Sequence, residues 1–237
     1  MTTTKINRRD AVRSFVGAVV SFILGLVGCA RRREVRTETL TIQEAQYVVA
    51  VILDLSGSFA SFMMEGGKAW SFATHVIDHF FRERLGSQDA LVIAQVSATG
   101  KPLLWDGEPY RLRQSFEDAG AFHAFLRQKS DPNGSRIYEG LAAALKYVLA
   151  YPGVSNGNAR SAVLILSDMY DTTGSEEAKT ALLKQLAAYG HVDGAVGMYW
   201  VDTNLVGDWR THLQDAGIKN AIVTADIVDN PPLPNFE

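Results

Sequence analysis

Three oxygen-bearing side chains follow a strongly apolar segment in the first part of the chain. Six apolar residues run from Val48 to Leu53, and Asp54, Ser56 and Ser58 come directly after them at alternate positions. A carboxylate and two hydroxyls on one loop are the hard oxygen ligands that Mg²⁺, Mn²⁺ and Ca²⁺ prefer in proteins. The same residues also fit a strand end followed by a Ser/Gly turn, so this loop alone leaves two interpretations open.

Two further loops carry the same kind of side chain. The segment 161–168 repeats the pattern of an apolar run that ends in an acid, and Ser135 closes a turn-rich stretch just before an Ala/Leu-rich segment. The carboxyl ends of parallel strands open on one edge of a sheet, where α/β proteins bind their ligands. We therefore expect one oxygen site, completed by water, from five residues: Asp54, Ser56, Ser58, Ser135 and Asp168.

The elements that must position these loops alternate between strands and helices. Apolar runs predict strands, at 48–53, 89–96, 161–168, 195–201 and 221–224, with a shorter edge strand at 102–105. Apolar periodicity predicts helices, at 66–84, 116–126, 137–149, 176–189 and 208–216. Residues 59–65 are expected to be a loop. The alternation predicts an α/β fold with a Rossmann-like, doubly wound, mostly parallel central sheet and helices on both faces.

Three of these segments resemble the metal-ion-dependent adhesion site of the von Willebrand factor type A (vWA) domain. Asp54-Leu55-Ser56-Gly57-Ser58 is similar to the family's Asp-x-Ser-x-Ser motif. Ser135 stands where the family has a threonine, and Asp168 stands where an aspartate closes the family's fourth strand. Met169 replaces the glycine that usually follows that aspartate. Asp171 is a further candidate, as an alternative ligand or as a residue that orients one.

The resemblance implies a binding domain and not an enzyme. In the family, the hydroxyls hold Mg²⁺ directly or through water, the acids complete or orient the shell, and an acidic side chain of a protein partner fills the open position. An exposed divalent cation attracts a carboxylate, and desolvation at an interface strengthens the pairing. A degenerate vWA scaffold that binds no metal is the main alternative.

Enzyme classes fit the sequence less well. Phosphatases with an aspartyl nucleophile carry a second aspartate two residues after the first, and Ser56 stands in that place, so a Mg²⁺-dependent hydrolase is the weakest alternative. His75 and His79 have the spacing of a zinc-protease helix, but Val76 replaces the required glutamate. Ser56 and Ser58 lie in no Gly-x-Ser-x-Gly elbow. We therefore expect no enzymatic activity.

Composition sets outer limits on the function. A chain of 237 residues with 47% hydrophobic content supports one substantial core. The formal net charge of -3 offers no basic surface for nucleic acid. The single cysteine excludes an intrachain disulfide framework and a multi-cysteine metal site.

The N-terminus has the layout of an export signal. A basic stretch up to Arg13 precedes the uncharged apolar run 14–28, which is shorter than the ~20 residues of a membrane-spanning helix. Leu26-Val27-Gly28-Cys29 resembles the lipobox of bacterial lipoproteins, in which the cysteine receives the lipid. Asn7-Arg8-Arg9-Asp10 partly resembles a twin-arginine signal.

These features predict how the chain is divided and where it is held. We expect residues 1–29 to be a signal peptide or an uncleaved membrane anchor, and residues 30–43 to be a polar tether. Residues 44–228 are expected to form the vWA domain, and residues 229–237 a Pro-rich tail. The protein is then a membrane-anchored protein of the cell envelope, on its periplasmic or outer face, attached through the N-terminal lipid or anchor.

Overall fold

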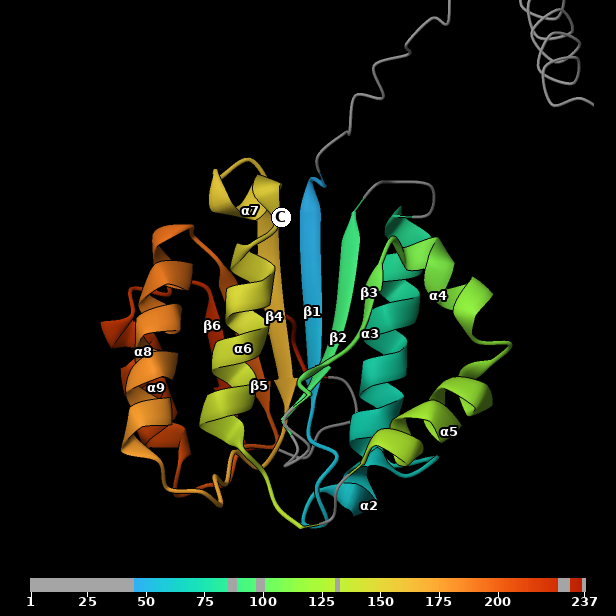
Figure 1. Ribbon diagram of the computed structural model, residues 1–237, viewed down its shortest axis with the longest axis horizontal. Coiled ribbons are helices and arrows are strands. Elements are labelled where there is room, and N and C mark those ends of the chain that lie inside the picture. The colour runs from blue at the N-terminus through green and yellow to red at the C-terminus, as the bar shows by residue number, and fades with distance from the viewer. Residues whose placement is uncertain (1–44, 85–88, 97–100, 131–132, 226–230, 236–237) are drawn as a thin grey trace, which may run out of the picture. The chain divides into compact units, whose positions relative to one another are not determined.

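Apolar segments of the sequence form the strands of one sheet (Figure 1). The computed structural model describes residues 45–84, 89–96, 101–130, 133–225 and 231–235, which all belong to the unit Gln43–Glu237. The expected signal segment with Cys29 and the expected tether lie outside the described residues. In the part of the chain that is described, no helix has the length and apolar character needed to cross a membrane.

The sheet has the strand order β3-β2-β1-β4-β5-β6, and every neighbouring pair is parallel except β2 and β3. Its strands are β1 (Tyr47–Leu53), β2 (Ala90–Gln95), β3 (Leu103–Gly107), β4 (Arg160–Leu166), β5 (Ala195–Tyr199) and β6 (Ala221–Thr224). β3 is the predicted edge strand. The predicted α/β class, with a Rossmann-like and mostly parallel sheet, is confirmed.

The strand order changes direction between β1 and β4. These two strands pair in parallel at the centre, with Leu53 opposite Leu166, and the sheet continues to β2 and β3 on one side and to β5 and β6 on the other. Connections that leave in opposite directions open a crevice at the carboxyl ends of the two strands, which is where open α/β sheets bind ligands. The loops that carry Asp54 and Asp168 both begin at this crevice.

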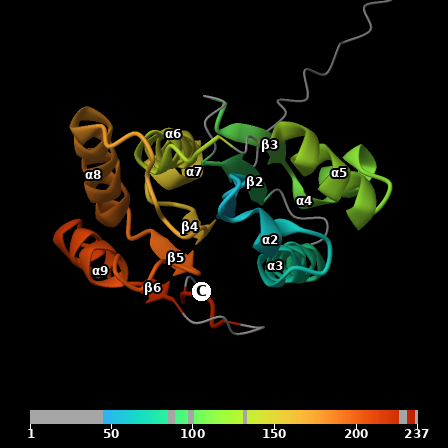
Figure 2. The ribbon, with the colours of Figure 1, turned by 90° about the horizontal axis from the view of Figure 1, so that it is seen from below.

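Helices cover both faces of the sheet because both faces of the central strands are apolar. In β1, Val48, Ala50 and Ile52 belong to one core cluster, and the alternate residues Val49, Val51 and Leu53 belong to the other. The first cluster is closed by α6 (Ile137–Leu149), α8 (Glu176–His191) and α9 (Val206–Asp215). The second is closed by α3 (Lys68–Arg84), α4 (Pro109–Ser115) and α5 (Ala119–Lys129), so α6 and α3 lie on opposite faces (Figure 2).

Three short helices were not predicted. α2 (Ala60–Met63) lies within the expected loop 59–65, and both α4 and α7 (Pro152–Ser155) start at a proline. The helix predicted over 116–126 was wrong at its start. Phe116 has an extended backbone that ends α4, and α5 begins only after Asp118, whose side chain accepts a hydrogen bond from Ala121 N at 2.7 Å.

A close approach of α6 to β2 fixes where the helix begins. A Cβ on Gly140 would lie 3.0 Å from Cα of Val96, the residue that follows β2. The absence of a side chain at Gly140 therefore lets the first turn of α6 pack directly on the sheet. Arg136 N also donates to Val96 O at 2.9 Å, which holds the residues before α6 at the carboxyl end of β2. This contact places Ser135 at the edge where β1 ends.

Candidate oxygen site at the carboxyl edge of the sheet

Asp54 is the centre of the hydrogen bonds at this edge. It is fully buried, and its backbone N donates to Leu166 O at 2.9 Å, which extends the pairing of β1 with β4 by one residue. Its Oδ1 accepts a hydrogen bond from Ser56 N at 2.9 Å, so the chain turns tightly after the strand. Ser56 Oγ lies 3.3 Å from Ser58 Oγ; Ser56 is buried and Ser58 is exposed.

Ser135 reaches the same carboxylate from the loop before α6. Its side chain is 1% exposed, and its Oγ lies 3.3 Å from both carboxylate oxygens of Asp54. The distances are long for a hydroxyl–carboxylate hydrogen bond, so this hydroxyl bridges the two oxygens weakly. The structure thus brings a third predicted loop to the end of β1.

Ser167 is a functional residue that sequence reasoning missed. Its Oγ donates to Asp54 Oδ2 at 2.7 Å, which is the shortest of the hydrogen bonds on this carboxylate, and it accepts from Met169 N at 2.8 Å. Only the register between β1 and β4 reveals this contact. Because Leu53 lies opposite Leu166, the residues that follow them, Asp54 and Ser167, must also lie side by side.

Asp168 lies on the solvent side of the same edge. It is half-buried, and its Oδ1 accepts a hydrogen bond from Tyr170 N at 3.0 Å. Its negative charge is close enough to Asp54 to contribute to the raised pKa of that residue. All five predicted residues therefore lie on loops at one edge, with Asp54, Ser56 and Ser135 in direct contact.

Two residues after β4 hold the Ser135 loop in place. Thr172 Oγ1 accepts a hydrogen bond from Ser135 N at 3.1 Å and donates to Ser135 O at 2.9 Å, and Thr172 N donates to the same carbonyl at 2.9 Å. Asp171 Oδ1 accepts a hydrogen bond from Tyr138 N, in the first turn of α6, at 3.3 Å. Asp171 thus contacts a helix terminus, where a negative charge is favourable, and ties the β4 loop to α6.

Met169 takes the backbone conformation that glycine would adopt at this position. Its φ is 64°, in the left-handed region, and its side chain is 2% exposed within the core cluster of α6, α8 and α9. A left-handed non-glycine residue costs about 1–2 kcal/mol, whereas burial of a methionine side chain contributes about 1.5–3 kcal/mol. The packing of Met169 therefore offsets the strain, and the turn after Asp168 forms without a glycine.

Burial makes the ionised form of Asp54 electrostatically unfavourable. Burial raises the pKa of Asp54, hydrogen bonds from Ser56 and Ser167 lower it, and the charge of Asp168 raises it further. Burial is the largest of these effects, so the ionised carboxylate lacks full compensation. A divalent cation among these oxygens would supply that compensation. In this respect the residues present suit the ion that the sequence predicts.

The ligand types at this edge are those that a hard cation prefers. Among the described residues, no group of three or more His, Cys, Asp or Glu side chains is placed to hold a metal ion. The oxygen site has two carboxylates, and serine hydroxyls make up the rest of the predicted ligands: Ser56, Ser58 and Ser135. A set without nitrogen or sulfur favours Mg²⁺, Mn²⁺ or Ca²⁺ over Zn²⁺ or Cu²⁺.

Two large side chains are exposed on the segments that follow Ser58 and Asp168. Met64 is 61% exposed at the end of α2, and Tyr170 is 56% exposed next to Asp168. Phe59 and Met63, from the same segment as Met64, are buried in the core. The edge therefore combines polar oxygens with two exposed side chains of the types enriched at protein interfaces.

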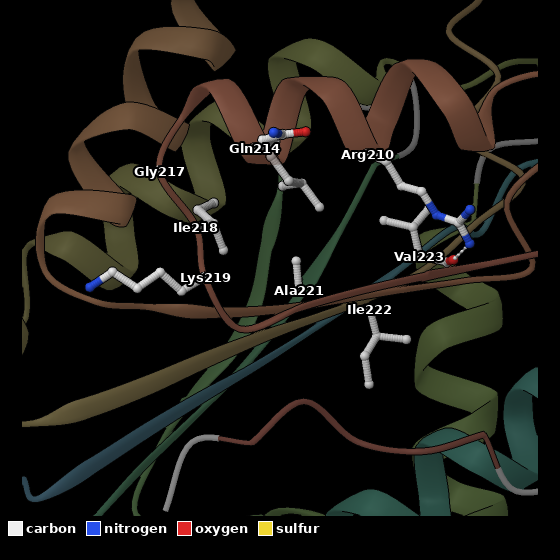
Figure 3. Close-up of a pocket in the computed structure, with 9 residues that line it drawn as sticks. Arg210, Gln214, Gly217, Ile218, Lys219, Ala221, Ile222 and Val223 are labelled. Carbon is white, nitrogen blue, oxygen red and sulfur yellow. Dashed lines mark hydrogen bonds between the residues drawn. The ribbon is translucent and has the colours of Figure 1, made fainter.

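Other features lie away from the oxygen site. A cavity of about 690 Å³ lies between α9 and β6, where Arg210 donates to Val223 O at 3.0 Å (Figure 3). Its lining includes none of the five predicted oxygen residues. A Gly-x-Ser-x-Gly pattern at 153–157 falls in α7 and the turn after it, where Ser155 Oγ donates to Pro152 O. It does not join a strand to a helix, as a hydrolase elbow requires.

Solved structures share this fold at low sequence identity. The TFIIH p34 N-terminal domain matches with a TM-score of 0.51 and 14% identity, over 76% of this chain and 91% of that domain. The pilus adhesin SpaC from Lactobacillus rhamnosus GG matches with a TM-score of 0.50 and 12% identity, over 79% of this chain and 29% of the adhesin. Proximal thread matrix protein 1 from the mussel byssus matches with a TM-score of 0.46 and 17% identity, over 78% of this chain and 45% of that protein.

The first two similarities establish a shared fold, which in the p34 domain is vWA-like. A scan of the sequence against protein-family models finds no match, and a search of the curated proteins also finds none.

Proposed function

We propose that this chain is a vWA-type interaction protein that binds a protein partner through a divalent cation, Mg²⁺ or else Mn²⁺ or Ca²⁺. The observation that carries the proposal is the meeting of three loops at the buried Asp54 carboxylate, where the neighbouring charge is negative. Such a set of oxygens is poorly compensated without a cation.

Each residue has a distinct part in this proposal. The hydroxyls of Ser56, Ser58 and Ser135 would hold the ion, and Asp54 and Asp168 would balance its charge. When bound, the ion supplies an exposed positive charge to which a carboxylate of the partner can bind. Ser167 and Thr172 position Asp54 and Ser135 through the hydrogen bonds described above.

The surface around the edge supports a protein as the partner. Met64 and Tyr170 are exposed side chains of types enriched at protein interfaces, on the segments that follow Ser58 and Asp168. One of the solved structures with this fold is a pilus adhesin, which is consistent with an adhesive or interaction role.

A metal titration of the purified protein tests the ion. In a metal-free background, Mg²⁺ or Mn²⁺ at 100 times its dissociation constant is expected to stabilise the fold by about 2.7 kcal/mol. For a domain of this size the melting temperature then rises by about 5–11 °C. Ser135→Ala is expected to lose most of this rise. Ser155→Ala is the control, because it also removes a hydrogen-bonded serine hydroxyl, but one that donates to the carbonyl of Pro152 in α7.

Two outcomes contradict the proposal. If neither ion changes the melting temperature, the domain is a scaffold without metal. If the ions support turnover of a generic phosphate ester and Asp54→Ala abolishes it, the protein is a hydrolase.

Capture of a partner from an envelope extract is expected to fail in EDTA and with Ser135→Ala, whereas Ser155→Ala captures it normally.

We also propose that the N-terminus tethers the domain to the cell envelope through a lipid on Cys29. The proposal rests on the lipobox-like Leu26-Val27-Gly28-Cys29, which follows an apolar run too short to span a membrane easily. Cys29→Ser is expected to prevent lipid attachment and processing, so that radiolabelled palmitate is no longer incorporated. Unchanged membrane association together with no labelling of the wild type would instead indicate an uncleaved anchor.

A further inference from the structure

Two histidines on the outer surface of α3 form a pair that the oxygen site does not use. His75 and His79 are four residues apart, so they lie on the same side of the helix, one turn apart. Both are exposed, and their rings are nearly parallel, with 14° between the ring planes and 6.5 Å between the centroids. The two imidazoles therefore extend side by side from the helix.

The ring nitrogens of this pair are available to a ligand. Within the described part of the chain, neither imidazole takes part in a hydrogen bond or an ion pair, and the ring contact of each is with the other imidazole. Both rings border a cavity of about 190 Å³, whose other walls include Pro231 and Leu233 of the C-terminal tail. The tail is held there by the Tyr199 hydroxyl, which donates to Pro232 O at 2.9 Å.

We propose that His75 and His79 chelate a transition-metal ion, with Cu²⁺ bound most tightly and Ni²⁺ and Zn²⁺ more weakly. Imidazole nitrogen is a preferred ligand of these ions. At a given nitrogen site, Cu²⁺ binds more tightly than either Ni²⁺ or Zn²⁺. Two histidines spaced i and i+4 on one helix face present both nitrogens to a single ion. Both side chains are exposed, so rotation about their χ angles between staggered rotamers can direct one nitrogen of each ring to a shared ion.

The pair supplies two protein ligands, and water completes the shell. No group of three or more His, Cys, Asp or Glu side chains that would suit a metal occurs among the residues whose placement is described, so this is an open site. Open coordination positions leave room for a ligand from another molecule. The nitrogen ligands also separate this site chemically from the oxygen site, because Mg²⁺ and Ca²⁺ prefer oxygen.

Titration with Cu²⁺ at pH 7.5, followed by visible absorption and by electron paramagnetic resonance, tests the chelate. The wild type is expected to bind one equivalent of Cu²⁺ tightly, and the spectrum of the bound Cu²⁺ should show hyperfine coupling to two nitrogen ligands. His75→Ala and His79→Ala are each expected to weaken this equivalent about 100-fold, because a second tethered ligand adds a factor of about 10²–10⁴ to affinity. Both positions are exposed, so the melting temperature of the metal-free variants should not change.

Three control variants test whether Cu²⁺ binding depends on this pair of histidines and on their spacing. His191→Ala removes an exposed histidine at the end of α8 and should leave the tight equivalent intact. His79→Ala combined with Arg82→His keeps two histidines on α3 but separates them by two turns, about 10 Å, which is too far for one ion. Asp54→Ala should also leave Cu²⁺ binding unchanged, so this site can fail or succeed independently of the oxygen site.

The proposal is overturned if the wild type shows no tight equivalent. It is equally overturned if the variant with the separated histidines binds as tightly as the wild type, or if 1 mM Mg²⁺ displaces the copper.

Discussion

Asp54→Asn is expected to stabilise the metal-free protein at neutral pH and to abolish its response to Mg²⁺. Asparagine has nearly the shape of aspartate and keeps one oxygen to accept from Ser56 N, but it carries no charge. The variant therefore avoids the cost of a buried and poorly compensated carboxylate. We expect a gain of about 2 kcal/mol, the scale on which polar and charged groups are penalised for burial, or about 4–8 °C in melting temperature.

The pH dependence of this gain follows from the direction of the Asp54 pKa. Burial raises that pKa in the folded protein above its value of 3.8 in the unfolded chain. Between these two pKa values the folded state binds more protons than the unfolded state, so the free energy of unfolding falls as pH rises through this window. The advantage of Asp54→Asn should appear across the same window and stay constant above it, when both proteins are measured in EDTA.

Asp118→Asn is the matched control for this substitution. Asp118 is exposed and caps α5 through Ala121 N, a position where asparagine serves as well as aspartate. It should change neither the metal-free stability nor the Mg²⁺ response by a measurable amount. A wild-type protein that is more stable in EDTA than Asp54→Asn would contradict the view that this carboxylate lacks compensation.

Gly134→Ala is expected to weaken the binding of Mg²⁺ by about 10–100-fold, the range found when residues that orient metal ligands are lost. Gly134 has a φ of 143°, and a Cβ there would lie 2.5 Å from Oγ1 of Thr172. The Thr172 side chain would have to move away, and the two hydrogen bonds that its hydroxyl makes with the Ser135 backbone would be lost. We also expect a loss of about 2 kcal/mol in stability from the strain and the broken bonds.

Gly157→Ala separates backbone strain from displacement of Thr172. Gly157 also has a positive φ, 75°, but a Cβ there meets no atom within 4 Å. This variant should lose about 1 kcal/mol of stability and keep its affinity for Mg²⁺. Isothermal titration of both variants makes the comparison. Equal affinities in the two variants would mean that Thr172 has no part in holding Ser135.

The central sheet was predictable because its two middle strands carry uninterrupted apolar runs. β1 is apolar from Val48 to Leu53 and β4 from Ala162 to Leu166, and both runs are buried, so each strand stands out in the sequence. α6 was predicted with its observed bounds, because turn residues precede it and its apolar positions recur over three turns. α2 and α4 have four and seven residues, which is too short for a periodic pattern to identify a helix.

The five oxygen residues were predictable for a related reason. Each follows a recognisable strand or precedes a recognisable helix, so the parallel sheet alone brings their loops to one edge. Ser167 and Thr172 could not be found in this way. The role of Ser167 depends on the register between β1 and β4, and that of Thr172 depends on the backbone conformation of Gly134. Neither property is visible in the local sequence.

The hydrogen bonds on Asp54 join residues that are far apart in the sequence, and this separation bears on the stage of folding at which the edge of the sheet forms. Ser135 and Ser167 lie 81 and 113 residues beyond Asp54 in the chain, so their contacts close very long loops. The pairing of β1 with β4 closes a loop of the same length, so these contacts need the centre of the sheet to form first or together with them. The proposed cation would therefore bind a domain whose central sheet is already in place. It should slow the unfolding of the domain and leave the rate of refolding almost unchanged.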